Sequence, residues 1–171
     1  MSGFEEDYER RVDDARRRAR AEGRGDVLDY LDLRAANDRL RAAGVEWLIG
    51  TLTALAGEAN RAGAGLALAR TDAHRFRVGN STMVGTRLVL SRGVRALTVE
   101  AGWPRAPRDG VVRGGGLASA LVGHFGRRGA GEELLLVPDG ESPRWFVLEK
   151  TGARTELLEE RLRTHLSQLV M

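Results

Sequence analysis

A change in hydrophobic period near residue 65 is the feature that most constrains the fold of this 171-residue chain. Before it, apolar residues recur every three or four positions, as on the buried stripe of an amphipathic helix. After it, apolar and polar residues alternate, as in strands with one buried face. The sequence therefore predicts an α+β fold in which helices pack on an antiparallel sheet.

The N-terminal part predicts a pair of helices. Phe4–Glu22 is almost entirely charged and has only a thin apolar stripe, so this helix is expected to pack lightly. Gly23 and Gly25 end it, and Asp26 is a suitable N-cap for a second helix that reaches Ala43. We expect the two helices to form a hairpin arm over residues 1–43.

A third and more apolar helix is predicted after Gly44, over Val45–Ala62, and its leucines place it in the core. Gly50 and Gly57 are seven residues apart and share a face of this helix. Because glycine is costly inside a helix, the pair suggests close backbone packing on that face.

The rest of the chain predicts a sheet of about six strands, with one short inserted helix and a closing helix packed on the sheet. Arg92-Gly93 and Asp139-Gly140 have the composition of tight hairpin turns. Residues 45–171 are expected to form the sheet-containing core of a single domain. The predicted strands are Leu66–Ala69, Arg75–Val78, Arg87–Leu90, Val94–Glu100, Glu133–Val137 and Arg144–Glu149, and the predicted helices are Leu117–Phe125 and Arg154–Val170.

Composition excludes several classes of function. The chain has no cysteine, which excludes disulfides, thiolate zinc sites, iron–sulfur clusters and cysteine nucleophiles. No apolar run approaches the roughly 18 residues of a membrane helix, and the first residues are acidic, so we expect a cytoplasmic protein without a membrane segment. His74, His124 and His165 lack metal-ligand spacing and are expected to be structural, so no metal or cofactor is predicted.

The charge is unevenly distributed along the chain. The formal net charge is only +3, and the pI near 10.1 reflects a chain in which Lys150 is the single lysine among many arginines, as is typical of a GC-rich bacterial genome. Residues 44–130 nevertheless carry 12 arginines against 5 acidic residues. A basic surface in the middle of the chain is therefore expected.

A partner-binding surface is predicted on the outer face of the sheet. Arg75 and Arg77 are two residues apart on a strand and so project from one face, opposite Phe76 and Val78. If Arg87 and Arg95 project there too, the surface suits an acidic protein segment or a nucleic-acid backbone. The chain has few aromatic residues for base stacking, which disfavours nucleic acid. Trp103, in an irregular stretch over residues 101–115, is expected either to anchor this loop or to present a contact to a partner.

The same loop offers a candidate anion cradle. Arginines lead to three consecutive glycines just before a predicted helix, where backbone N–H groups and the helix dipole favour a phosphate or carboxylate. The pattern lacks the Gly-Lys ending of a Walker sequence and the spacing of a dinucleotide fingerprint, so a mobile loop is the alternative interpretation. The residues concerned are Arg105, Arg108, Arg113, Gly114, Gly115 and Gly116.

A catalytic interpretation rests on two carboxylates near these arginines. Glu100 at a strand end and Asp109 in the loop would act as acid and base, or hold a metal, on a phosphorylated substrate. Nothing in the sequence fixes their separation, and no Gly-x-Ser-x-Gly nucleophile motif accompanies them. No residue is therefore predicted to be catalytic.

The predicted elements after Val45 follow one another in a definite order: the Trp47–Ala59 helix, the strands around Leu66 and Phe76, the stretch Ala101–Pro104 and the Leu158–Leu169 helix. This order resembles that of type III secretion chaperones over about three quarters of the chain. The resemblance implies a homodimer that binds an extended segment of a client protein and performs no chemistry. The chain differs from that family in its basic character and in its additional N-terminal residues.

Taken together, these features favour a non-enzymatic binding or adaptor module that holds a protein partner through the basic sheet face or the Trp103 loop. The N-terminal hairpin offers a surface for a homodimer. The alternatives are an enzyme that handles anions through the glycine-rich loop and a nucleic-acid-binding protein.

Overall fold

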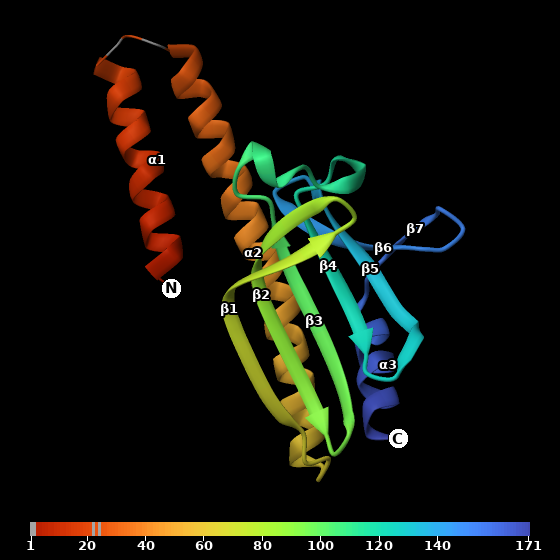
Figure 1. Cartoon of the computed structure of the whole chain (residues 1–171). Coiled ribbons are helices and arrows are strands. Elements are labelled where there is room, and N and C mark those ends of the chain that lie inside the picture. Colours follow the sequence, from red (N-terminus) through yellow and green to blue (C-terminus); the bar gives the residue numbers. More distant parts are fainter. Residues whose placement is uncertain (1–2, 22, 24) are drawn as a thin grey trace. The chain divides into compact units, whose positions relative to one another are not determined.

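The computed structural model describes residues 3–21, 23 and 25–171 (Figure 1). These residues form three α-helices, seven strands and two 3₁₀ turns, and the α+β fold class is confirmed. The chain groups into two compact units, Met1–Leu40 and Arg41–Met171. Of the described helices, none combines the length and the apolar character needed to cross a membrane.

The N-terminal unit contains α1, Gly3–Ala21, and the first part of α2, Gly25–Arg61. The Tyr8 hydroxyl donates a hydrogen bond to the Asp38 carboxylate at 2.8 Å, and Arg16 forms an ion pair with Asp32 at 3.1 Å. Tyr8 near the start of α1 thus contacts a later residue of α2 than Arg16 does, so the two helical segments run antiparallel. Phe4–Glu22 was expected as a single lightly packed helix, and of its residues Glu22 lies outside the described part.

A single helix replaces the two helices predicted over residues 26–62. α2 continues through Gly44, which the sequence prediction treated as a break. A Cβ on Gly44 would lie 2.5 Å from Leu136 Cδ2, and the Gly44 carbonyl accepts a hydrogen bond from Trp145 Nε1 at 2.8 Å. Gly44 is therefore the site of close helix–sheet packing. The expectation of close backbone packing at Gly50 and Gly57 was wrong, because nothing lies within 4 Å of a Cβ placed on Gly50 and only the Arg61 side chain, at 3.6 Å, lies near one placed on Gly57.

The seven strands form one antiparallel sheet in which each strand pairs with its neighbours in the sequence. The turns at Gly93 and Gly140 have positive φ, and both predicted hairpins are confirmed. The strands are β1 Ala67–Val78, β2 Ser81–Arg92, β3 Arg95–Trp103, β4 Ala118–His124, β5 Arg127–Asp139, β6 Ser142–Leu148 and β7 Arg154–Glu156.

Three sequence predictions are corrected by the sheet. Leu66–Ala69 and Arg75–Val78, predicted as two strands, belong mostly to the single strand β1. The predicted short helix Leu117–Phe125 is strand β4, which pairs with both β3 and β5. The closing helix α3 spans Glu159–Val170 and begins later than predicted, because Arg154–Glu156 form strand β7, which pairs with β6.

The register defines two faces of the sheet, since paired residues of antiparallel strands share a face. We call the helix face the one that carries Leu90, Leu97 and Leu136. Within the Arg41–Met171 unit, the second half of α2 and α3 lie along this face (Figure 1). Leu52 and Leu162 are almost fully buried there. This is the main core of the unit.

The opposite face, which we call the loop face, is covered at one end by residues 104–117, and within this segment Asp109 lies beside the edge strand β1, 3.8 Å from the Arg75 guanidinium group. This segment contains η1, Pro107–Asp109, and η2, Arg113–Gly115. A Cβ on Gly116 would lie 2.3 Å from Leu135 Cδ1 on this face. Ser81 Oγ donates to the Val111 carbonyl at 2.8 Å and accepts from the Val111 N–H at 3.2 Å. The loop is thus packed on the sheet at these two points.

Candidate functional site

The long edge of the sheet is formed by β1. It has twelve residues, and its ladder partners within the described part of the chain come from β2 alone. The opposite edge, β7, has only three residues. An edge strand presents one row of N–H and C=O groups that the sheet does not use. β1 therefore offers the main backbone surface on which a further strand can pair.

A bulge divides β1 into two segments. The register with β2 shifts between Thr71 and His74, and Ala73 has a φ of 52°, in the left-handed region that is unusual for alanine. Beyond the bulge, His74 Nε2 lies 2.6 Å from Glu100 Oε2, and its ring stacks on Phe76 with 5.9 Å between centroids. These contacts hold the second segment, His74–Val78, in place.

The alternation predicted for this segment is confirmed. Phe76 and Val78 are buried, at 7% and 5% exposure, whereas Arg75 and Arg77 are exposed. The Arg75 side chain is 64% exposed, and its Nη2 lies 3.8 Å from Asp109 Oδ1 of η1. No ion pair of Arg77 occurs in the part of the chain that the structure describes. Both guanidinium groups are therefore accessible.

The backbone groups of the two arginines point away from the sheet. Gly79 has a φ of 59°, and the two-residue turn Gly79–Asn80 joins the paired residues Val78 and Ser81. The pair that closes such a hairpin is hydrogen-bonded, and hydrogen-bonded pairs alternate with non-hydrogen-bonded ones. It follows that Arg75 and Arg77 occupy non-hydrogen-bonded positions and that their N–H and C=O groups face the free edge.

The four arginines predicted to share a surface are not brought together. Arg75 is in register with Val84, on the helix face, whereas Arg87 is in register with Thr71 and Glu100, on the loop face. Arg95 lies next to the β2–β3 turn and pairs with the end of β2. The predicted common basic face is therefore reduced to Arg75 and Arg77.

Trp103 is not available as a contact for a partner. It lies in β3, is 5% exposed, and is covered by Arg105, whose guanidinium carbon lies 3.7 Å from the ring centroid. Arg105 Nη2 also donates to the Val84 carbonyl at 3.0 Å. The Trp103 indole N–H is buried and makes no hydrogen bond to the described residues. The prediction that Trp103 belongs to the irregular stretch was wrong, because it is the last residue of β3.

The helix behind the predicted anion cradle is absent, because the residues after Gly116 form β4. The prediction that a helix dipole contributes to anion binding at this loop was therefore wrong. Gly114 and Gly115 have positive φ, and the Gly114 carbonyl accepts a hydrogen bond from Arg154 at 3.3 Å. Arg113 forms an ion pair with Glu133 at 3.3 Å. These arginine contacts fasten the loop to neighbouring strands, while Arg108 on η1 is exposed.

The two carboxylates of the catalytic interpretation have different partners. Glu100 contacts His74, and Asp109 contacts Arg75. These adjacent residues of β1 project from opposite faces of the strand. The structure therefore gives no support to a paired acid and base.

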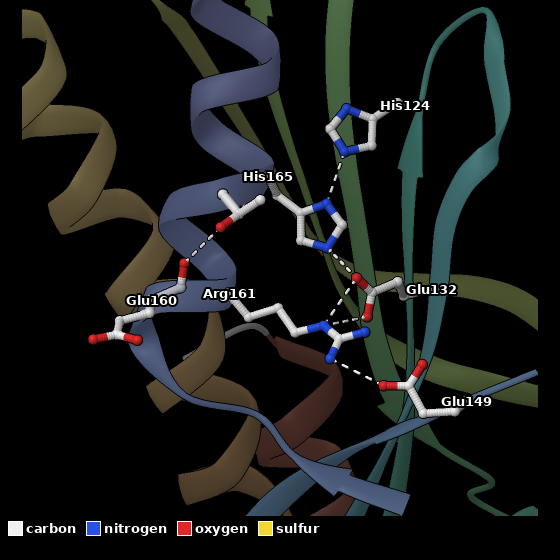
Figure 2. A network of polar contacts seen from close by, with 7 residues as sticks. His124, Glu132, Glu149, Glu160, Arg161 and His165 are labelled. Atoms are coloured by element: carbon white, nitrogen blue, oxygen red, sulfur yellow. Dashed lines mark hydrogen bonds and ion pairs between the residues drawn. The ribbon is translucent and has the colours of Figure 1, made fainter. Parts of the chain in front are cut away.

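A polar network that the sequence did not predict joins α3 to the sheet (Figure 2). His165 Nδ1 lies 2.8 Å from His124 Nε2, and His165 Nε2 lies 2.8 Å from Glu132 Oε1. Arg161 Nε contacts both Glu132 oxygens, at 3.1 and 3.0 Å, and its Nη1 lies 3.0 Å from Glu149 Oε1. The network ties α3 to β4, β5 and the residue after β6.

The two histidine contacts are linked, because the pair His124–His165 needs one donor and one acceptor. In the tautomer of His165 that donates from Nε2 to Glu132, Nδ1 accepts and His124 donates from Nε2. Burial lowers the pKa of His124, and the nearby His165 and Arg127 lower it further, against the opposing effect of Glu132. These effects favour the neutral form of His124. The side chains form a linear chain, and no group of three potential ligands converges on a metal position within residues 3–21, 23 and 25–171.

One signal for this network was present in the sequence. His165 lies three residues after Leu162 and four before Leu169, and so shares the buried face of α3 with these leucines. A histidine at such a position requires polar partners on the surface beneath it. Glu132 was not identifiable as that partner, because it lies in a different element.

Comparisons with protein-family models, with curated proteins and with solved structures found no match for this chain.

Proposed function

We propose that this protein is a binding module that takes up an extended segment of another protein as an additional strand on the edge of β1. The observation that carries the proposal is the second segment of β1, His74–Val78, where Arg75 and Arg77 combine outward backbone groups with exposed side chains. Backbone pairing of this kind supplies affinity, and the neighbouring side chains supply selectivity.

The other surfaces offer less to a partner. In the glycine-rich loop, Arg105 donates to the Val84 carbonyl and Arg113 pairs with Glu133, whereas Arg108 is exposed. Two of the three predicted arginines therefore already contact the chain itself, which weakens the argument for an enzyme that handles anions. Arg87 and Arg95 lie apart from Arg75, so a continuous basic track for nucleic acid is not formed by the four residues. An extended protein segment fits the remaining site, and such a segment is also what the resemblance to type III secretion chaperones implies.

The test uses the full chain labelled with ¹⁵N and a set of seven-residue peptides rich in β-branched residues. We expect peptide addition to shift the amide signals of Arg75 and Arg77 and to slow their hydrogen exchange, because these N–H groups become hydrogen-bonded. N-methylation of alternate peptide residues removes the peptide donors without changing the protein, and it should abolish binding.

Two matched variants isolate the backbone contribution. Arg75→Pro removes both the outward N–H and the charge, whereas Arg75→Gln keeps the N–H. Arg75→Pro should lose binding of an uncharged peptide, and Arg75→Gln should retain it. Peptides that leave the β1 amides unchanged, or N-methylated peptides that bind as well as their parents, contradict the proposed function.

A further inference from the structure

We propose that the segment taken up by β1 is acidic at alternate positions, with an aspartate or glutamate at each of two residues separated by one other residue. This inference rests on the proposed function and identifies the chemistry of the partner. The carboxylates would lie against Arg75 and Arg77, which project from the helix face of β1.

The spacing follows from strand geometry. Arg75 and Arg77 are two residues apart, so their Cα atoms are separated by about 6.6–7 Å along the strand. A strand paired with β1 has the same repeat, and it places residues two apart on the same face as the arginines. Directly opposite side chains then have Cβ atoms about 5 Å apart, within reach of an ion pair.

The charges on the edge favour carboxylates. Arg77 makes no ion pair within the described residues, so it is available to a partner. Arg75 already faces a carboxylate, because Asp109 lies 3.8 Å from its guanidinium group. At 64% exposure of Arg75 this contact is weak, and a carboxylate on an added strand can replace it.

A second copy of the chain is a poor occupant of the same edge. Antiparallel self-pairing centred on Phe76 places Arg75 of one copy directly opposite Arg77 of the other, on the same face. Like charges in directly opposite positions destabilise a strand pair. In this register the β1 edge disfavours a second copy and favours an acidic segment.

The experiment measures binding of fluorescent heptapeptides to the full chain by anisotropy. Three peptides share one sequence of alternating charged and valine positions, with glutamate, glutamine or lysine at the charged positions, and a thymidine heptanucleotide is the fourth probe. Two cross-strand ion pairs predict that the glutamate peptide binds about 2- to 30-fold more tightly than the glutamine peptide. The lysine peptide should bind most weakly of the three.

Variants of exposed residues assign this difference to the two arginines. In the Arg75→Gln/Arg77→Gln double variant, the glutamate and glutamine peptides should bind equally, whereas the matched control Arg95→Gln should leave the difference unchanged. Asp109→Asn removes the internal competitor for Arg75 and should tighten binding of the glutamate peptide by about two- to fivefold. Thermal unfolding followed by circular dichroism checks that each variant is folded.

The outcomes separate this inference from the proposed function. Equal affinities of the glutamate and glutamine peptides for the wild-type chain overturn the acidic pattern while leaving strand addition intact, as does a difference that survives in the double variant. Tighter binding of the heptanucleotide than of the glutamate peptide overturns it in favour of nucleic acid. Absence of β1 amide shifts with every peptide removes the proposed function as well.

Discussion

The two glycines of α2 provide a direct test of the packing between this helix and the sheet. Gly44→Ala and Gly50→Ala make the same chemical change in the interior of one helix, and alanine is favoured over glycine there by about 1 kcal/mol. At Gly50 nothing lies within 4 Å of the added Cβ. We therefore expect Gly50→Ala to stabilise the protein by about 1 kcal/mol.

At Gly44 the added Cβ meets a filled core. It would lie 2.5 and 2.8 Å from the two methyl carbons of Leu136, whose side chain is completely buried. Overpacking of this kind costs about 1–3 kcal/mol. After the gain in helix propensity is included, Gly44→Ala should destabilise the protein by about 0–2 kcal/mol, which places it about 1–3 kcal/mol below Gly50→Ala.

The free energy of unfolding is to be measured by urea titration, with helix content and tryptophan fluorescence as probes. A difference of 1 kcal/mol corresponds to roughly 2–4 °C in Tm for a chain of this length, so the gap is also visible by heating. Leu136→Ala should cost less in the Gly44→Ala background than in the wild type, because the smaller side chain relieves the overlap. Equal stability of Gly44→Ala and Gly50→Ala would refute the packing argument.

Two further predictions concern the network beneath α3. Because burial, His165 and Arg127 lower the pKa of His124, the folded protein resists a proton that the unfolded chain accepts near the ordinary histidine pKa of about 6.5. Stability should therefore fall as the pH drops from about 6.5 through the folded pKa of His124. His124→Gln should flatten this part of a stability profile measured between pH 5 and 8, and an unchanged profile would contradict the assignment. Glu132→Gln removes the charge that Arg161 and His165 share and should destabilise the protein by about 1–3 kcal/mol in urea unfolding at pH 7, whereas a loss below 0.5 kcal/mol would show that the network contributes little.

The fold class was predictable because the hydrophobic period of each element is local information. The same information misassigned residues 117–125, where Ala118, Ala120 and Leu121 suit a helix by propensity. In the structure Ala120 pairs with Ala101 and Leu134 in the middle of the helix face. The residues that suit a central strand are those whose side chains pack against the neighbouring strands. Tertiary contacts, and not local propensity, therefore determine the secondary structure of this segment.

The face of the sheet from which Arg87 projects was predictable in principle. Gly79-Asn80 is a recognised two-residue hairpin signal, and it pairs residues whose numbers sum to 159, such as Arg77 with Thr82. That register places the odd-numbered residues of β2 on the face opposite Arg75. The bulge near Ala73 changes the partner of Arg87 but leaves its face unchanged, because the strand β2 itself is regular. What the sequence did not reveal is the contact between β1 and the loop, which depends on the packing of both.

That contact connects the loop to the proposed binding edge. Asp109 is only 13% exposed and lies at the end of η1, with its Oδ1 3.8 Å from Arg75 Nη2. Arg75, in contrast, is mostly solvated, and an ion pair with such a partner is worth about 0–1 kcal/mol. The loop can therefore orient Arg75 along the edge without making it unavailable. A carboxylate on an added strand needs only to match this weak contact, while the backbone hydrogen bonds at Arg75 and Arg77 provide the remaining affinity.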